Sequence, residues 1–297
     1  MRIDKISKLL DCDYYAKLEN LQPTGAFKVR GGVNLVGTAG GSGRTNRNTL
    51  ITASTGNHGQ SIAYAGRLFG VPVIIYAPTE NVNEAKVQAM RDLGAEVRLH
   101  GRDFDEARLE VERLAASEQG LRYVHSANEP ALIAGVGTIG MEIFEDLSEV
   151  DVIIAPAGGG SCASGNCIVA NQIRPKTRMI AVQSEAAPAL WHAYRNRNLD
   201  AFPTMETEHE GLATRVPFEL TNRILWDGLD DFVLVSDEEI NDAIRLLARD
   251  ARQIAEGAGA ASLAGAIKVR DRLRGKKVVG IVTGGNIPLP RFAKLMN

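Results

Sequence analysis

The sequence predicts an α/β protein with parallel sheets, and two observations carry this prediction. Short runs of β-branched and other apolar residues alternate along the chain with longer stretches of helical periodicity. Strands separated by helices are typical of parallel sheets that carry helices on both faces. The chain has 297 residues, and a prior of roughly 150 residues per domain indicates two lobes.

The individual elements follow from local signals in chain order. The expected strands are 50–54, 73–76, 96–99, 152–155, 179–183, 232–235 and 278–282, with helices between them. Gly70 and Gly94 each follow a helical stretch, at the position where a left-handed residue ends a helix. Ser236 and Glu239 form a capping-box pattern that predicts a helix running on through Leu247.

Composition excludes several classes of protein. Apolar residues make up 44% and charged residues 24% of the chain, which is unlike a disordered protein. The formal net charge of −2 gives no electrostatic attraction to nucleic acid or to an anionic membrane. No apolar run approaches the ~20 residues that a membrane-spanning helix needs, and the N-terminus lacks the apolar core of a signal peptide. We therefore expect a cytoplasmic protein without nucleic-acid or membrane partners.

The cysteines, the histidines and one glycine pattern give no sign of a zinc site or a dinucleotide site. The chain has 3 cysteines, too few for a disulfide framework, which indicates a reducing compartment. Cys162 and Cys167 lack a paired Cys or His set, so zinc is not expected. The 5 histidines show no metal-binding spacing and are expected to be single capping or surface residues. GVGTIG (135–140) matches the dinucleotide pattern GxGxxG but follows no expected strand, so it is not expected to bind a dinucleotide.

Turns rich in glycine and hydroxyl residues adjoin the expected strands, where ligands bind in open α/β sheets. One strand runs into Ser54, Thr55, Gly56 and Asn57, and a helix begins near His58. N–H groups at a helix N-terminus bind anions such as a carboxylate. The same residue types also serve as an ordinary helix cap, so this turn leaves both interpretations open.

Two later strands end in similar turns. A buried strand runs into Gly158-Gly159-Gly160-Ser161, whose successive N–H groups suit a phosphate. A merely flexible loop fits poorly between an apolar strand and a helix. The Walker pattern GxxxxGK[ST] is absent, so a nucleoside triphosphate is not expected. Another strand ends at Thr283 before two glycines, which by itself is a turn.

Lys28 is the candidate reactive residue of the N-terminal region. It follows the turn signal Pro23-Thr24-Gly25 and the aromatic Phe27. A lysine beside apolar and cationic neighbours can act as an amine nucleophile or form a Schiff base. Taken alone, Lys28 is better explained as a surface lysine of an amphipathic helix, because lysine side chains are mostly exposed.

Together these turns carry a family resemblance. The strings KLENLQPTGAFKVRGG, STGNHGQ, PAGGGSCASG, EGAGAASLAG and TGGN occur in the order found in fold-type II pyridoxal-phosphate enzymes. From about residue 13 to 286, the chain resembles the threonine/serine dehydratase and serine racemase group. The resemblance implies two interleaved open parallel-sheet lobes, as in tryptophan synthase β, with the cofactor cleft between them. It places a large cofactor-binding domain in 1–45 and 130–297, and a small mobile domain in 46–129.

The resemblance implies roles around the ring of pyridoxal 5'-phosphate. Lys28 matches the catalytic Schiff-base lysine, and Phe27 matches a residue that lies against the ring. Asn57 matches the residue that hydrogen-bonds the ring hydroxyl, and Thr283 matches the hydroxyl residue facing the pyridine nitrogen. Glu256 falls in a family motif near the ring.

Two loops complete the implied site. The family's phosphate-binding loop matches Gly158, Gly159, Gly160 and Ser161. The loop that holds the substrate carboxylate matches Ser54, Thr55, Gly56 and His58. In serine racemases a serine occupies the position of Thr55 and acts as the second base. Threonine is a poor substitute there, which argues against efficient racemisation.

Three further implications concern metal, chain length and assembly. The racemase-like divalent metal site would use Glu185, the carbonyl of Ala189 and an acidic residue at Trp191. Tryptophan cannot ligate a hard cation, so no metal site is expected.

Family members carry a longer segment before the lysine, so this chain resembles a version with a short N-terminus. The resemblance also implies a homodimer.

The implied function is that of a pyridoxal-phosphate-dependent dehydratase, or ammonia-lyase. It would convert a β-hydroxy amino acid of the threonine or serine type into a 2-oxo acid and ammonia. The neutral hydroxyl of Thr283 agrees with this, because it cannot keep the pyridine nitrogen protonated as an aspartate would, which favours elimination over transamination. The alternatives are a serine racemase-like or β-replacement enzyme on the same cofactor, and a cofactor-binding remnant without turnover.

Overall fold

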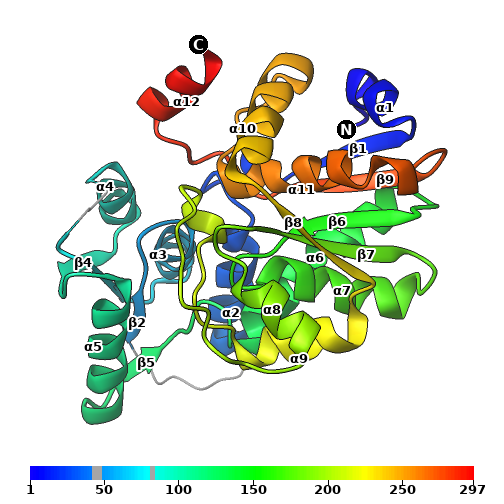
Figure 1. Cartoon of the computed structure of the whole chain (residues 1–297). Helices are drawn as coiled ribbons and strands as arrows, with labels where there is room; N and C mark the ends of the chain where they lie inside the picture. Colours follow the sequence, from blue (N-terminus) through cyan, green and yellow to red (C-terminus); the bar gives the residue numbers. More distant parts are fainter. Residues whose placement is uncertain (42–48, 81–83) are drawn as a thin grey trace. The chain divides into compact units, whose positions relative to one another are not determined.

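The computed structural model describes residues 1–41, 49–80 and 84–297 and confirms an α/β fold with two parallel sheets (Figure 1). The strands are β1 (Asp13–Leu18), β2 (Thr49–Ala53), β3 (Val73–Ala77), β4 (Glu96–Leu99), β5 (Leu121–Tyr123), β6 (Val152–Pro156), β7 (Arg178–Ser184), β8 (Asp231–Val235) and β9 (Lys277–Val282). The helices are α1 (Asp4–Leu10), α2 (Lys28–Gly41), α3 (Asn57–Phe69), α4 (Glu84–Asp92), α5 (Phe104–Ser117), α6 (Pro130–Asp146), α7 (Ser161–Ile173), α8 (Ala189–Asn196), α9 (Glu219–Gly228), α10 (Asp237–Leu246), α11 (Gly257–Lys268) and α12 (Leu289–Met296). Shorter helical turns are η1 (Glu19–Leu21), η2 (Glu210–Leu212), η3 (Leu247–Ala251) and η4 (Arg270–Arg272).

The chain folds as two compact units. The large unit comprises Met1–Phe27 with Val136–Asn297, and the small unit comprises Lys28–Gly135. These limits differ from the expected domain boundaries near 45 and 129, the first of which lies outside the described residues. Helix α2 belongs to the small unit because it packs on α3, where the Ser61 hydroxyl donates to the carbonyl oxygen of Lys28 at 2.6 Å.

The large unit contains a five-stranded parallel sheet in the order β1-β9-β6-β7-β8. Successive residues of a strand point to opposite faces, and both faces are buried. Ile154 and Val182 pack with α1, α10 and α11 in one core, whereas Ile153 and Ala181 pack with α6, α7 and α9 in the other. Figure 1 shows α10 and α11 on one side of this sheet and α7, α8 and α9 on the other.

The small unit contains a four-stranded parallel sheet in the order β4-β3-β2-β5. It follows the same principle of two buried faces. Leu50 and Ile75 pack with α2, α3 and α4, whereas Ile51 and Tyr76 pack with α5. Both sheets are therefore covered on each face, as the alternation of strands and helices predicts.

The local signals read from the sequence are present in the structure. Gly70 caps α3 with a φ of 68°, and Gly94 follows α4 with a φ of 92°. Ser236 and Glu239 form both hydrogen bonds of a capping box at the start of α10. The GVGTIG stretch lies inside α6, so it does not have the strand–turn–helix context of a dinucleotide-binding pattern.

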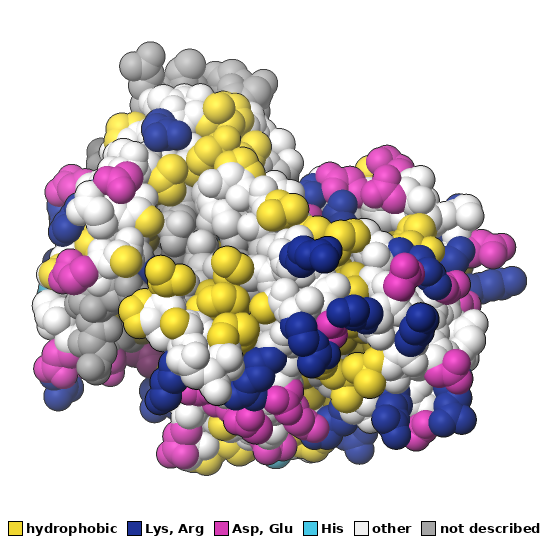
Figure 2. All heavy atoms as spheres, turned by 90° about the horizontal axis from the view of Figure 1, so that it is seen from above, with side chains coloured by type: hydrophobic (Ala, Val, Ile, Leu, Met, Phe, Trp, Pro, Cys, Tyr) yellow, Lys and Arg dark blue, Asp and Glu magenta, His cyan; other side chains and the backbone are white. Residues whose placement is uncertain are grey.

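Two observations concern the lengths of the described helices and the charge of one face of the molecule. In the described ranges 1–41, 49–80 and 84–297, no helix is both long enough and apolar enough to cross a bilayer. On the face drawn in Figure 2, basic, acidic and hydrophobic side chains all occur, in keeping with a formal net charge of −2.

Candidate active site

The small unit presents the loop between β2 and α3, which the sequence associates with a substrate carboxylate. The Ser54 hydroxyl accepts hydrogen bonds from the N–H groups of Gly56 at 3.2 Å and Gly59 at 2.8 Å. Ser54 is buried, Thr55 is exposed, and Asn57 is half-buried as the first residue of α3. Ser54 therefore shapes the turn and accepts from the first turn of α3, and the loop lies at a helix N-terminus, the end of a helix that favours an anion.

His58 lies beneath this loop rather than on it. Its Nε2 atom is 2.9 Å from the Thr52 hydroxyl, which itself donates to the carbonyl oxygen of Val124 at 2.8 Å. Because the hydroxyl proton of Thr52 is used, Nε2 must carry a proton and donate it. Burial, followed by the positive charge of Lys28, lowers the pKa of His58 to about 3. His58 is thus a neutral, buried support of the loop, and its proposed contact with substrate stays a prediction.

Replacing His58 with glutamine is expected to flatten the acid dependence of stability. The unfolded chain protonates His58 near its ordinary pKa of 6.5, whereas the folded protein does so near 3, so stability is complete above pH 6.5 and falls as the pH is lowered. Lowering the pH from 7.5 to 5 therefore reduces the unfolding free energy of the wild type by about 2 kcal/mol through His58 alone. His58→Gln has no such group and is expected to keep this part of its stability. Urea unfolding at both pH values measures it.

The control for this comparison is His100→Gln, because His100 is exposed on the same unit. That variant is expected to keep the pH dependence of the wild type. Equal loss of stability in His58→Gln and in the wild type between the two pH values would show that His58 is not the buried neutral base described above.

Lys28 is the first residue of α2 and of the small unit. Its carbonyl oxygen accepts from Ser61 on α3, so the backbone of Lys28 is fixed beside the helix that begins with the Ser54–His58 loop. Its positive charge is also close enough to contribute to the lowered pKa of His58. The pKa of His125 is lowered mainly by burial, with smaller effects from charges on α5 and from Lys28. Two neutral imidazoles thus share the surroundings of this lysine.

The large unit brings two of the expected ligand-binding turns to one edge of its sheet. Strands β6 and β9 are parallel neighbours whose register pairs Ile154 with Gly280. Three residues further on, Ala157 and Thr283 therefore leave the sheet at the same level, at the carboxyl ends of the strands. Thr283 is 2% exposed, and Gly158 follows Ala157 directly.

The turn Gly158–Ser161 fits a phosphate group. A methyl group on Gly158 would lie 2.1 Å from the carbonyl oxygen of Gly211, so only glycine is accommodated there. Gly160 adopts a left-handed φ of 88° and leads into α7. The carbonyl oxygen of Gly159 accepts from Thr221, and that of Gly160 accepts from the first turn of α7. The carbonyl groups of Gly159 and Gly160 are therefore hydrogen-bonded within the protein. The N–H groups of the turn lie at a helix N-terminus, which suits an anion.

Phe27 and Glu256 are fixed to the same edge. The N–H of Phe27 donates to the carbonyl oxygen of Thr283 at 2.9 Å, and the N–H of Glu256 donates to that of Gly284 at 3.0 Å. Phe27 is largely buried in the core on the α7 side, and Glu256 is the N-cap of α11. The chain that leads to Lys28 is therefore tied to the end of β9, since Lys28 follows Phe27 directly.

The residues of the racemase-like metal site lie at the end of β7 and at the start of α8. Glu185 is exposed at the end of β7. The indole nitrogen of Trp191 donates to the carbonyl oxygen of Phe232 at 3.1 Å, and the backbone N–H of Trp191 donates to Gln183. Trp191 is thus built into the packing of α8, and the expectation of no metal there stays a prediction.

Sequence reasoning missed several polar residues near these turns. Thr52 supports His58, but a threonine inside a strand gives no signal of such a bond. His125 follows the short β5, and its Nδ1 atom accepts from the N–H groups of Ala127 and Asn128. His125 therefore stabilises the turn before α6 and does not cap a helix, and His58 is neither a cap nor on the surface.

Nearly the whole chain is similar to known proteins. A family model described as "Pyridoxal-phosphate dependent enzyme" matches residues 1–284. The L-threonine ammonia-lyase of Thermotoga maritima is 37% identical over 296 residues, which cover 98% of this chain and 72% of that protein. The catabolic L-threonine dehydratase TdcB of Staphylococcus aureus is 37% identical over 282 residues, which cover 94% of this chain and 80% of that protein.

Solved structures show the same similarity. Threonine deaminase isoform 2 from Solanum lycopersicum matches with a TM-score of 0.93 and 30% identity, covering 99% of this chain and 85% of that one. Serine racemase from Dictyostelium discoideum matches with a TM-score of 0.88 and 29% identity, covering 97% of this chain and 92% of that one.

Proposed function

The chain belongs to the pyridoxal-phosphate dependent enzyme family, and on this premise we propose that it is an ammonia-lyase for β-hydroxy amino acids. It would convert a threonine- or serine-type substrate into a 2-oxo acid and ammonia. The observation that carries the proposal is the buried hydroxyl of Thr283, level with the phosphate-type turn at Gly158. A neutral hydroxyl at this position favours elimination, and the relatives named threonine ammonia-lyase agree with it.

The proposal gives a role toward the cofactor to each residue that the family resemblance singles out. Lys28 would hold the cofactor through its amine, and the N–H groups from Gly158 to Ser161 would bind its phosphate. Asn57 would bond the ring hydroxyl, Phe27 would lie against the ring and Thr283 would face the pyridine nitrogen. Glu256, which caps α11 beside Gly284, lies near the ring. The fit of the glycine turn to an anion is the structural support for this assignment.

The chain's own residues would then divide the chemistry among them. When bound, the cofactor supplies an electron-withdrawing ring that stabilises negative charge at the substrate Cα. The N–H groups at the start of α3, shaped by Ser54, hold the substrate carboxylate. The Nζ atom of Lys28 takes the proton from Cα as general base. The β-hydroxyl leaves as water, and hydrolysis of the released enamine gives the 2-oxo acid and ammonia.

Incubation of the purified protein with threonine tests this proposal. Equal amounts of 2-oxobutanoate and ammonia are expected, together with a phosphopyridoxyl group on the peptide containing Lys28 after borohydride reduction. D-serine formation from L-serine, measured in parallel, would favour the racemase alternative. An adduct on Lys28 without any oxo acid would favour a cofactor-binding remnant, and the absence of both would refute the proposal.

Two finer parts of the proposal concern location and assembly. We propose that the protein acts in the cytoplasm, which is supported by Cys12, Cys162 and Cys167 being buried thiols and not disulfide partners. We also propose that it is a homodimer, on the resemblance to the family alone. Small amino acids are its expected partners, with no nucleic acid and no membrane.

A further inference from the structure

A short segment of the large unit lies against the phosphate-type turn. We call Thr207–Leu212 the wedge segment, because it contacts both that turn and the first turn of α11. Its Gly211 carbonyl oxygen would lie 2.1 Å from a methyl group on Gly158. Its His209 ring would lie 2.0 Å, at Nδ1, from a methyl group on Gly257. The position of the wedge segment therefore limits where Gly158 and the start of α11 can sit.

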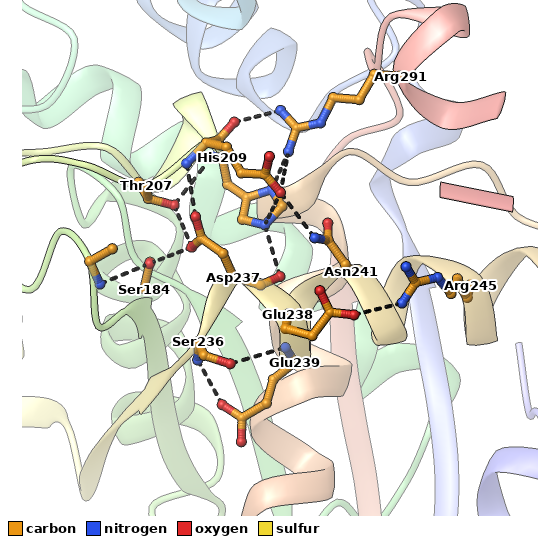
Figure 3. Close-up of polar contacts among 12 residues, drawn as sticks. Ser184, Thr207, His209, Ser236, Asp237, Glu238, Glu239, Asn241, Arg245 and Arg291 are labelled. Carbon is orange, nitrogen blue, oxygen red and sulfur yellow. Dashed lines mark hydrogen bonds and ion pairs between the residues drawn. The ribbon is translucent and has the colours of Figure 1, made fainter. Parts of the chain in front are cut away.

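Asp237 anchors the beginning of the wedge segment (Figure 3). Its carboxylate accepts from the hydroxyls of Thr207 at 2.7 Å and Ser184 at 2.8 Å, and from the N–H of Glu208 at 2.8 Å. Burial acts to raise the pKa of Asp237, but these hydrogen bonds outweigh it and hold the pKa below its ordinary value. A charged carboxylate thus ties the wedge segment to the ends of β7 and β8.

Arg291 of α12 clamps the wedge segment from the other side. Its guanidinium donates to the carbonyl oxygen of Glu208 at 2.5 Å and to Nδ1 of His209 at 3.1 Å, and it lies 3.3 Å from the Glu208 carboxylate. Because arginine only donates, Nδ1 must accept, so the proton of His209 is on Nε2, 3.3 Å from the carbonyl oxygen of Asp237. The side chain of His209 is fully buried in this single tautomer.

This network does not have the character of a cation site. Glu208, His209 and Asp237 place possible ligand atoms within 4.8 Å of one another. However, the Asp237 carboxylate already accepts three hydrogen bonds, and the Arg291 guanidinium occupies Nδ1 and repels a second positive charge. The arrangement is a set of hydrogen bonds that orients the wedge segment.

We propose that Arg291 and His209 are positioning residues for the cofactor phosphate, because they hold Gly211 against Gly158 and so fix the N–H groups of the turn. This rests on the proposed function, in which that turn binds the phosphate. Without Arg291, the Glu208 carbonyl and the buried Nδ1 of His209 lose their donor. The wedge segment is then free to withdraw from Gly158, and the turn loses its fixed shape.

The test compares pyridoxal phosphate with pyridoxal, which lacks the phosphate but still reacts with Lys28. Titration of cofactor-free protein with each compound gives two dissociation constants. In Arg291→Ala, the constant for pyridoxal phosphate is expected to rise about 10-fold or more, while that for pyridoxal stays within twofold. Arg291→Lys keeps the positive charge but loses the planar guanidinium that donates to two acceptors at once. Its dissociation constant for pyridoxal phosphate is expected to lie between those of the wild type and Arg291→Ala. At saturating cofactor, kcat is expected to stay within twofold of the wild type.

Arg245→Ala is the matched control. Arg245 also holds α12, through the carbonyl oxygen of Leu295, but it contacts Glu238 and Asp242 instead of the wedge segment. Unchanged affinities are expected in this variant. If it weakened phosphate-dependent binding as much as Arg291→Ala, loss of α12 packing would explain the effect and the proposal would be wrong.

A second variant keeps the test decisive if Arg291→Ala fails to fold. His209→Asn keeps an acceptor near Nδ1 but cannot reach the Asp237 carbonyl, and a threefold or larger loss confined to pyridoxal phosphate is expected. An equal loss for both compounds, or none, would overturn the proposal. Failure of the wild type to bind either compound would instead contradict the proposed function.

Discussion

Replacement of Lys28 with alanine is expected to reduce 2-oxobutanoate formation from threonine by about 10³-fold or more. The variant loses both the amine that bonds the cofactor and the general base for the Cα proton, and a positioned base alone contributes roughly 10² to 10⁴. Its fold is expected to persist, because the Ser61 bond goes to the carbonyl oxygen of residue 28 and not to the side chain. Oxo-acid release at saturating cofactor, with peptide mapping after borohydride, measures the effect.

Lys17→Ala is the control for this prediction. Lys17 is a largely buried lysine of the large unit that pairs with Glu142. Its loss is expected to lower stability slightly and to leave turnover within twofold of the wild type. Retention of more than a tenth of wild-type turnover in Lys28→Ala would remove this lysine from the proposed mechanism.

The second large effect is expected from Gly158→Ala. The new methyl group would meet the carbonyl oxygen of Gly211 at 2.1 Å, and a backbone atom cannot move aside as a flexible side chain can. The turn must therefore shift, with a cost of about 1–3 kcal/mol in unfolding free energy. Affinity for pyridoxal phosphate is expected to fall about 100-fold, as measured by titration of cofactor-free protein.

Gly275→Ala separates the loss of stability from the loss of affinity. Gly275 has a φ of 69° and open space around it, so alanine there costs about 1–2 kcal/mol through backbone strain alone. This control is expected to lose stability but to bind pyridoxal phosphate normally. If Gly158→Ala also bound it normally, the turn would not be the phosphate site.

The expected strands are all present, and the strands that the sequence did not reveal lie at sheet edges. β5 has only three residues, with Arg122 at its centre. β1 begins with Asp13 and contains Lys17, so it lacks a continuous apolar run. Edge strands tolerate charged side chains because one side of the strand is not covered by a neighbour. Of the edge strands, apolar runs therefore reveal β4 and β8 and miss β1 and β5.

The candidate site was predictable where its signals are local. Glycine and hydroxyl residues directly after a strand, such as Gly158 and Thr283, indicate a ligand-binding turn without knowledge of distant partners. The hydrogen bond between Arg291 and His209 joins residues 82 positions apart, and nothing in either neighbourhood marks it. The burial of His58 likewise depends on Val124, which holds the Thr52 hydroxyl from another part of the small unit.

The order in which the strands are joined has a consequence for synthesis on the ribosome. The small unit is one continuous stretch whose ends touch, since a methyl group on Gly135 would lie 2.5 Å from the carbonyl oxygen of Arg30. β1, by contrast, pairs with β9, which comes much later in the sequence, so β1 cannot pair until that segment has been made. Because domains generally fold as units during translation, the small unit can mature while Asp13–Leu18 still lacks a partner. The nascent chain thus carries an unpaired β1 until β9 emerges, and the large sheet closes only after the small unit has been made.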